Sequence, residues 1–206
     1  ARQLAVVIFA NLSFQPCNTT SLVCPELLEI LVAAASSTND DTKMNAITSL
    51  GNLCRFEGNN SVLANYDEGA VIRVLSHVIS SNRSTSNDVR TSAARALLKL
   101  TRNSSVSWWD KHGLTLDLLA TAVLTDSIIS VRVRAAETLK ELSRRLSTNT
   151  DLLDALVKAT RTSDPGSKCC IAEALQIMST NVGSRKMVAE HPGVLNALVA
   201  MAMLDD

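Results

Sequence analysis

Aromatic residues are scarce in this chain of 206 residues, which has only two Trp, one Tyr and three Phe. Neither sign of charge is in excess, because Lys and Arg together number 20 and so do Asp and Glu. A nucleic-acid-binding protein usually carries a basic excess, so this balance argues against a nucleic-acid partner. No apolar run approaches the roughly 18 residues of a membrane-spanning helix. We therefore expect no direct insertion into a membrane.

Glycine and proline are also few, at seven and four residues, while apolar residues make up 46% of the chain. A disordered chain would be poorer in apolar residues or more highly charged. With so few aromatic rings, the core must be built from Leu, Val, Ile and Ala, a composition that favours packed helices over sheets. The composition predicts an all-α protein that is long enough to bury a sizeable core.

Five cysteines occur, an odd number without the spacing of a disulfide framework. Free cysteines at apolar helical positions indicate a reducing compartment, so we expect an intracellular protein of the cytoplasm or nucleus. Of the adjacent pair Cys169 and Cys170, at least one is expected to pack in the core. No cluster of residues has metal-ligand spacing, and the sequence gives no reason to expect a metal or another cofactor.

Internal repeats are the strongest signal in the sequence. Two patterns of apolar residues recur five times each, at intervals of 36 to 47 residues. Within each pattern the apolar positions are three or four residues apart, which is one face of an α-helix. The first pattern closes on Leu31, Leu75, Leu119, Leu156 and Leu198. The second reads Ala5-Phe9-Leu12, Ala46-Leu50-Leu53, Ala93-Leu97-Leu100, Ala135-Leu139-Leu142 and Ile171-Leu175-Met178.

Polar residues ahead of the second pattern predict where its helices begin. Asn39 or Asp40 can accept the free backbone N–H groups of one helix, and Asn87 those of the next. Asp164 followed by Pro165 is a further N-cap with proline at the first helical position.

Gly69, Gly113 and Gly193 precede helices of the first pattern and predict turns from a short helix into a longer one. The fourth unit has only residues 147–150 in which to place a short helix, so none is expected there. Each of the other complete units should therefore hold a short helix followed by two longer ones. The expected short helices are Asn60 to Tyr66, Val106 to Lys111 and Ser184 to Glu190.

A three-helix unit of about 42 residues resembles the armadillo repeat. Phe9-Ala10-Asn11-Leu12-Ser13 and Leu50-Gly51-Asn52-Leu53-Cys54 are similar to the third-helix signature of that family. Asp88-Val89-Arg90 and Ser130-Val131-Arg132 resemble the opening of the second helix in the related HEAT repeat. The resemblance covers essentially all of 1–206, and implies a single repeat domain that is a segment of a longer right-handed α-solenoid of about five repeats, the terminal ones incomplete.

The family resemblance also implies a function. Armadillo proteins typically bind extended peptides in a concave groove lined by their third helices. In the nuclear-import receptors of the family, a groove Trp precedes the groove Asn by four residues, but here Val7 and Thr48 stand at those positions. A receptor of the importin type, which reads basic signals, is therefore disfavoured.

If the residue before each third-helix leucine faces a groove, that groove has a polar end, a basic middle and an acidic end. We would then expect an extended ligand whose charge changes sign along its length. The Trp108-Trp109 pair is expected to be at least partly buried, and an exposed Trp there would be an anchor for a partner. The candidate groove residues are Asn11, Thr48, Asn52, Arg95, Lys99, Glu137, Glu141 and Glu173.

Nothing in the sequence argues for catalysis. Glu137 and Glu141 lie on one helical face, but with Arg134 and Lys140 nearby they are typical of a solvated face of mixed charge. The leading prediction is a non-enzymatic scaffold that binds a protein or a peptide. Two alternatives remain: a structural segment of a larger assembly, whose subunits or further repeats cover both ends, and a HEAT-type helical enzyme or chromophore-handling protein.

Overall fold

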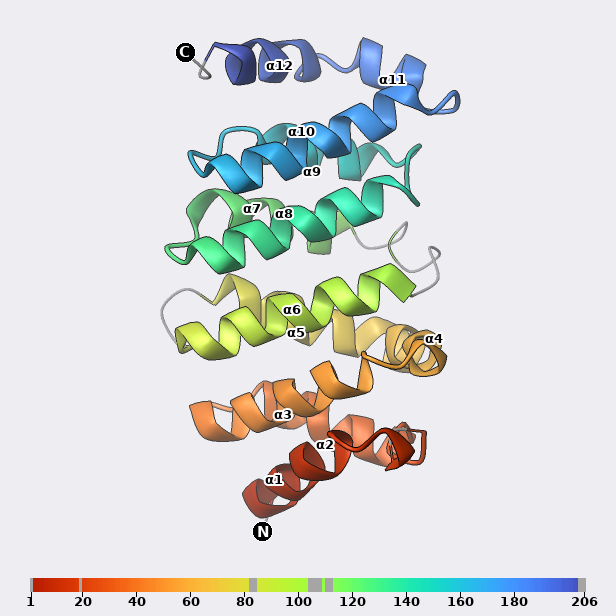
Figure 1. Ribbon diagram of the computed structural model, residues 1–206, viewed down its shortest axis with the longest axis vertical. Helices are drawn as coiled ribbons and strands as arrows, with labels where there is room; N and C mark the ends of the chain where they lie inside the picture. The colour runs from red at the N-terminus through yellow and green to blue at the C-terminus, as the bar shows by residue number, and fades with distance from the viewer. Residues whose placement is uncertain (1, 19, 82–84, 104–108, 110–112, 204–206) are drawn as a thin grey trace. The chain divides into compact units, whose positions relative to one another are not determined.

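The computed structural model describes residues 2–18, 20–81, 85–103, 109 and 113–203 (Figure 1). All regular structure in this part of the chain is helical, and it contains no strand. The chain divides into two compact units, 1–108 and 109–206. The prediction of a single repeat domain over 1–206 stays a prediction.

The first unit contains three helices that carry the second apolar pattern, and we call helices of this kind third-type helices. They are α1, α3 and α6, which pack in that order (Figure 1). Helices α2 and α5 carry the first apolar pattern, and we call helices of this kind second-type helices. They pack on each other, and in addition α2 packs on α3 and α5 packs on α6. The helices of this unit are α1 (Arg2–Ser13), α2 (Pro25–Ala35), α3 (Asp40–Leu53), α4 (Glu57–Asn65), α5 (Ala70–Ser80) and α6 (Asn87–Asn103), with the short 3-10 helices η1 (Pro16–Asn18) and η2 (Tyr66–Gly69).

The second unit repeats this plan. Helix α8 packs against α10, while α7 packs against both α8 and α9. The helices are α7 (Gly113–Thr125), α8 (Ile129–Ser143), α9 (Thr150–Ala159), α10 (Pro165–Thr180), α11 (Arg185–Glu190) and α12 (Val194–Ala202).

The repeated leucines form the cores of both units. The second-pattern leucines of α3, α6 and α8 have no solvent exposure, and Leu31, Leu75, Leu119 and Leu156 of the first pattern are at most 1% exposed. Burying a leucine side chain contributes about 1.5–3 kcal/mol, so these recurring positions are the main favourable term that holds each pair of helices together.

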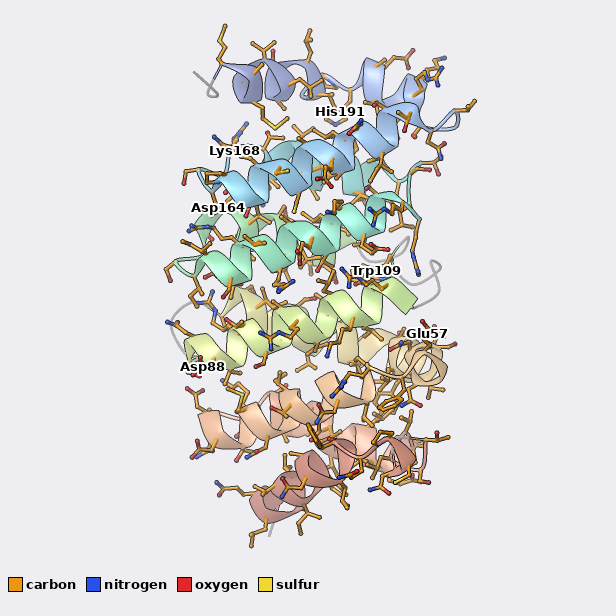
Figure 2. The ribbon with its side chains drawn as sticks, in the orientation of Figure 1. Glu57, Asp88, Trp109, Asp164, Lys168 and His191 are labelled. Atoms are coloured by element: carbon orange, nitrogen blue, oxygen red, sulfur yellow. The ribbon has the colours of Figure 1, made fainter. Side chains whose placement is uncertain are left out.

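Two helices, α3 and α10, begin where their capping residues predict, and α9 has a cap that was not predicted. Asn39 Oδ1 accepts a hydrogen bond from the backbone N of Thr42 at 2.8 Å, and Asp164 Oδ2 accepts one from the backbone N of Ser167 at 2.7 Å. Figure 2 shows Asp164 at the start of α10. Asn149 caps α9 in the same way. Each side chain satisfies a backbone donor that the first turn of a helix leaves free.

The predicted cap of α6 is wrong by one residue. Asn87 is the first residue of the helix, and the hydroxyl of Ser86 instead accepts from the backbone N of Val89 at 3.5 Å. Both residue types are good caps, and a Ser-Asn-Asp sequence offers the backbone several possible starts.

Arg90 and Arg132, the arginines of the two segments that resemble HEAT repeats, occupy equivalent positions at the starts of α6 and α8. Arg90 is 1% exposed, and its Nε donates to the carbonyl oxygen of Ile79 at 3.3 Å. Arg132 Nη1 donates to the carbonyl oxygen of Asp126 at 2.7 Å. Each arginine therefore satisfies a carbonyl at the end of the preceding second-type helix, an acceptor that the helix itself leaves open.

The predicted short helices are found where the structure describes the chain. Helix α4 with η2 covers the first, α11 covers the last, and no helix lies between Ser143 and Thr150 in the fourth unit. The predicted helix Val106 to Lys111 lies outside the described residues, apart from residue 109.

The turn from α4 into α5 carries backbone strain. Gly69 has a φ of 84°, and the preceding Asp67 and Glu68 also have positive φ, 43° and 50°. A side chain makes this conformation unfavourable by roughly 1–2 kcal/mol for each residue. Arg73 donates to the carbonyl oxygens of both Asp67 and Glu68, which holds the turn in place.

The first and last helices expose apolar faces whose equivalents are buried in the interior repeats. Leu12 is 41% exposed although Leu53 and Leu100 are fully buried, and Leu198 is 45% exposed although Leu156 is fully buried. The other large apolar side chains exposed on these two helices or just beyond them are Leu4, Ile8, Phe14, Leu195, Val199 and Met203.

Candidate functional site

Helices α3 and α6 form a hollow of about 130 Å³ that holds four of the predicted groove residues. Thr48 and Asn52 lie one turn apart on α3, and Arg95 and Lys99 lie one turn apart on α6. The α3 and α6 faces therefore meet in the register that the third-helix alignment predicts. The remaining lining residues are Ile47, Gly51, Ser92 and Ala96.

Polar groups of this hollow are only partly used by the chain itself. Asn52 Nδ2 donates to Ser13 Oγ of α1 at 3.2 Å, which fixes the amide and leaves its carbonyl oxygen available as an acceptor. The hydroxyls of Thr48 and Ser92 have no hydrogen-bond partner within the described chain. Asn11, the equivalent of Asn52 on α1, is exposed and does not line the hollow.

The positive charge of the hollow is uncompensated within the described residues. Neither Arg95 nor Lys99 forms an ion pair there, and nor does Arg55, which lies just beyond the end of α3. Burial lowers the pKa of the Lys99 ammonium, and the nearby charges of Arg55 and Arg95 lower it further, against an opposing influence from Cys54. The three cations therefore repel one another, and an anion bound among them would relieve that repulsion.

Sequence reasoning missed Arg55 and Ser92. Ser92 lies three residues before Arg95 and seven before Lys99, a spacing that places it on the same face of α6 and could have identified it. Arg55 follows the last turn of α3, where helical periodicity no longer applies.

The predicted acidic residues of the second unit are neutralised by neighbouring cations. Two pairs join residues three apart, one within α8 and one between α8 and its C-cap residue, a spacing visible in the sequence, while the third joins α8 to α10. The predicted acidic end of a groove therefore becomes a surface of mixed charge. The pairs are Glu137 Oε2 with Arg134 Nη1 at 2.7 Å, Glu141 Oε2 with Arg144 Nη1 at 2.6 Å, and Glu173 Oε2 with Lys140 Nζ at 3.0 Å.

The aromatic anchor is not available at the position that the structure describes. Trp109 is 1% exposed, so it is buried and cannot anchor a partner, while Trp108 lies outside the described residues.

Cysteine burial differs from the prediction for the adjacent pair. Cys169 is exposed and Cys170 is half-buried, so neither belongs to the core. The α10 helix turns its buried face, which includes Ile171, Ala174 and Leu175, away from them. Cys54 is fully buried, and burial raises the pKa of its thiol to about 12. Such a thiol is inert as a nucleophile.

His191 stabilises the turn that leads from α11 into α12. Its Nδ1 accepts from the backbone N of Gly193 at 3.2 Å, and its Nε2 lies 2.9 Å from Asp154 Oδ1 of α9. His112 lies outside the described residues.

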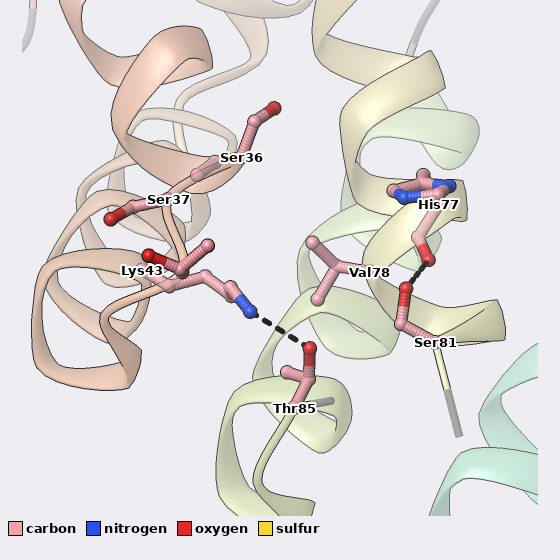
Figure 3. A pocket seen from close by; sticks show the side chains of 9 residues that line it. Ser36, Ser37, Lys43, His77, Val78, Ser81 and Thr85 are labelled. Carbon is pink, nitrogen blue, oxygen red and sulfur yellow. Dashed lines mark hydrogen bonds between the residues drawn. The ribbon is translucent and has the colours of Figure 1, made fainter. Parts of the chain in front are cut away.

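A second hollow, of about 280 Å³, lies beside the loops that precede α3 and α6 (Figure 3). Lys43 is 6% exposed there, and its Nζ donates to Thr85 Oγ1 at 2.9 Å and to Asp40 Oδ1 at 3.5 Å. Asp40 Oδ2 also accepts from the backbone N of Ser86 at 3.1 Å. Lys43 and Asp40 thus brace one repeat against the loop of the next, and their charges offset each other.

Within the described ranges, no group of three or more His, Cys, Asp or Glu side chains could hold a metal ion. No described helix combines the length and the apolar character needed to cross a membrane.

Comparison with solved structures establishes the fold. A crystal structure of a computationally designed armadillo repeat protein for modular peptide recognition matches 96% of this chain with a TM-score of 0.71 and 18% identity, over 84% of its own length. Two crystal structures of engineered proteins match at TM-scores of 0.69 and 0.71, with 19% and 21% identity. They cover 98% and 95% of this chain, and 79% and 47% of their own chains.

No protein-family model matches the chain, and no curated protein matches it closely enough to count as a relative. The solved structures share too little sequence identity to carry a ligand across to this chain, but they share its helical plan over nearly its whole length. The predicted fold is confirmed: the chain is an α-solenoid of armadillo-type repeats.

Proposed function

We propose that this chain is a non-enzymatic scaffold that binds an extended peptide along the third-type helices of its first unit, with the hollow between α3 and α6 as the site that anchors an anionic group. The observation that carries the proposal is the charge of that hollow. Arg95 and Lys99 line it without an acidic partner in the described chain, whereas the predicted acidic residues of α8 and α10 are all paired.

Helix spacing supports an extended ligand. Packed helices lie about 10 Å apart, and an extended peptide advances about 3.3 Å per residue, so each repeat matches about three peptide residues. Asn52 can accept a hydrogen bond from the peptide backbone through its free carbonyl oxygen, while Arg95 and Lys99 meet an acidic side chain. The solved armadillo design for modular peptide recognition is consistent with such a use of the fold.

The charge compensation in the second unit changes the expected ligand. A ligand whose charge reverses sign along its length would need unpaired carboxylates on α8 and α10, and Glu137, Glu141 and Glu173 each already have a cation within 3.0 Å. We therefore expect an acidic segment opposite α3 and α6, and neutral or mixed residues in the rest of the peptide.

A selection from a random peptide library against the whole chain tests this proposal. We expect the selected peptides to be enriched in Asp and Glu and to lose binding when Arg95→Glu and Lys99→Glu are combined. The matched control combines Arg161→Glu with Lys186→Glu, which changes the net charge equally at exposed positions outside the hollow. Loss of binding in the control but not in the α6 variant would place the site elsewhere.

A second candidate function has one observation in its favour. The exposed apolar faces of α1 and α12 suit a segment that other proteins or repeats cover within a larger assembly. In that case Leu4→Lys combined with Ile8→Lys would abolish co-purification of the assembly and leave the binding of selected peptides unchanged. The opposite result, with assembly retained, would remove this candidate.

A further inference from the structure

The hollow between α3 and α6 brings more positive charge together than one carboxylate would neutralise. Lys99 and Arg95 line it, and Arg55 lies close enough to Lys99 for its charge to disfavour the protonated ammonium. A single Asp or Glu side chain placed there would leave two of these three cations uncompensated. A dianion would offset most of their mutual repulsion.

Neutral donors surround the same space. The hydroxyls of Thr48 and Ser92 line the hollow from opposite helices and have no partner within the described chain. A carboxylate has two oxygens to satisfy, whereas a phosphate monoester presents three strong acceptor oxygens and a charge of about −1.5 to −2 at neutral pH. Two hydroxyls, a guanidinium and an ammonium match the larger number of acceptors.

The dimensions also favour a compact anion. The hollow measures about 130 Å³, and Gly51 and Ala96 are the smallest residues that line it. An added Cβ on Gly51 would lie 3.5 Å from Ala96 Cβ, so α3 and α6 approach each other closely at this point. A space of this volume suits one side-chain head group.

We propose that this hollow is a subsite for a phosphorylated serine or threonine side chain of the bound peptide. Lys99 and Arg95 contact the phosphate oxygens, Thr48 and Ser92 donate to them, and Arg55 supplies the additional charge that distinguishes phosphate from carboxylate. This inference rests on the proposed function, because it assigns the side chain at the acidic position of the same peptide.

Three pools of nine-residue peptides, applied to the immobilised whole chain, test the subsite. The pools share a mixture of uncharged residues and differ only at the central position, which is phosphoserine, glutamate or serine. We expect the phosphoserine pool to be retained about tenfold more tightly than the glutamate pool, since hydrogen bonds to charged groups each contribute on the order of a tenfold change in affinity. The serine pool should be retained least.

Two variants separate the roles of the cations. Arg55→Gln should remove most of the preference for phosphoserine over glutamate and leave retention of the glutamate pool nearly unchanged. Lys99→Gln should weaken both pools. Arg161→Gln, an exposed arginine outside the hollow, is the matched control and should change neither. Circular dichroism of each variant checks that the helices are intact.

Each contrary result has a definite meaning. Equal retention of the phosphoserine and glutamate pools would overturn the phosphate subsite and leave the peptide-binding proposal standing. Retention of no pool would overturn both. A phosphoserine preference that survives in both the Arg55 and the Lys99 variants would assign the phosphate to another surface. Full competition by inorganic phosphate at the peptide's own concentration would show a site for the free anion instead.

Discussion

Asp164 should contribute measurably to stability, because it serves two partners from a buried position. It is 7% exposed, its Oδ2 accepts from the backbone N of Ser167 at 2.7 Å, and its Oδ1 lies 3.7 Å from Arg132 Nη2 of α8. Loss of an N-cap costs about 1 kcal/mol. Loss of the carboxylate beside a largely buried guanidinium adds on the order of 1 kcal/mol.

We therefore expect Asp164→Ala to lower the free energy of unfolding by about 2 kcal/mol. Asp164→Asn should lower it by about 1 kcal/mol, since an Asn side chain caps a helix as well as Asp does but carries no charge. Urea denaturation of the whole chain, followed by far-UV circular dichroism, measures both. Asp88→Asn is the control, because it removes the same charge from an exposed position in the first turn of α6.

The dependence on pH supplies an independent test. Burial alone would raise the pKa of the Asp164 carboxyl, but the hydrogen bonds from Ser167 and the charge of Arg132 outweigh it and hold that pKa below the ordinary value of 3.8. A carboxyl whose pKa is lower in the folded state stabilises the fold above its unfolded pKa, and this contribution is lost as the pH falls through the folded pKa. The stability difference between wild type and Asp164→Asn should therefore be fully present at neutral pH and shrink at pH values below about 4.

A cost of Asp164→Ala no greater than that of Asp88→Asn at neutral pH would refute both the cap and the ion pair as sources of stability. If Asp164→Asn and Asp164→Ala cost the same, the ion pair with Arg132 carries the effect and the cap contributes nothing. A wild-type advantage over Asp164→Asn that persists unchanged at pH 3 would show that the charge is not its source.

Other substitutions test the packing of the repeats. Leu97→Ala and Leu139→Ala, at positions with no solvent exposure, should each lower the free energy of unfolding by about 2–5 kcal/mol in urea denaturation. Asp117→Ala, at an exposed ion pair, should change it by no more than about 0.5 kcal/mol. Equal costs at the two kinds of position would mean that the helical faces are misassigned. Arg73→Ala should cost about 1–2 kcal/mol despite its exposed side chain, because it removes the two hydrogen bonds that hold the turn before α5, and a thermal melt identical to wild type would contradict this. Gly193→Ala should cost about 1–3 kcal/mol, because an added Cβ would lie 2.7 Å from a valine methyl carbon of α9, and an unchanged melting temperature would show that α9 can yield without cost.

Arg73 shows why a surface position could not be judged from its pattern alone. In the first pattern Arg73 is the polar residue that follows the first apolar one, as Asp117 is in the next unit, so periodicity places it on the solvent side of its helix. Such a position predicts a substitution cost within about 0.5 kcal/mol. The structure places its guanidinium on two carbonyls of a left-handed turn. The positive φ of Glu68 has no signature in residue type, because that conformation is common only in glycine and, less often, in Asn and Asp.

Much of the architecture follows from the sequence because the responsible interactions are local. Spacings of three and four determine which leucines share a face, and an Asn, Asp or Ser within one residue of the observed start closes the first turn of each capped helix. The repeat length and the register between α3 and α6 also follow, since every unit must bury the same face against its neighbour. That register is why Thr48, Asn52, Arg95 and Lys99 were predicted together and lie around one hollow.

Only the tertiary structure decided which charges remain for a ligand. Lys140 reaches Glu173 from 33 residues away, and Asn52 reaches Ser13 from 39 residues away, because these contacts depend on the distance and rotation between neighbouring helices. Residue type alone makes the Arg95–Lys99 surface and the Glu137–Glu173 surface look like opposite ends of one charged groove. Side-chain pairing neutralises the second and leaves the first uncompensated, because an ion pair forms only where the fold brings opposite charges within about 4 Å of each other.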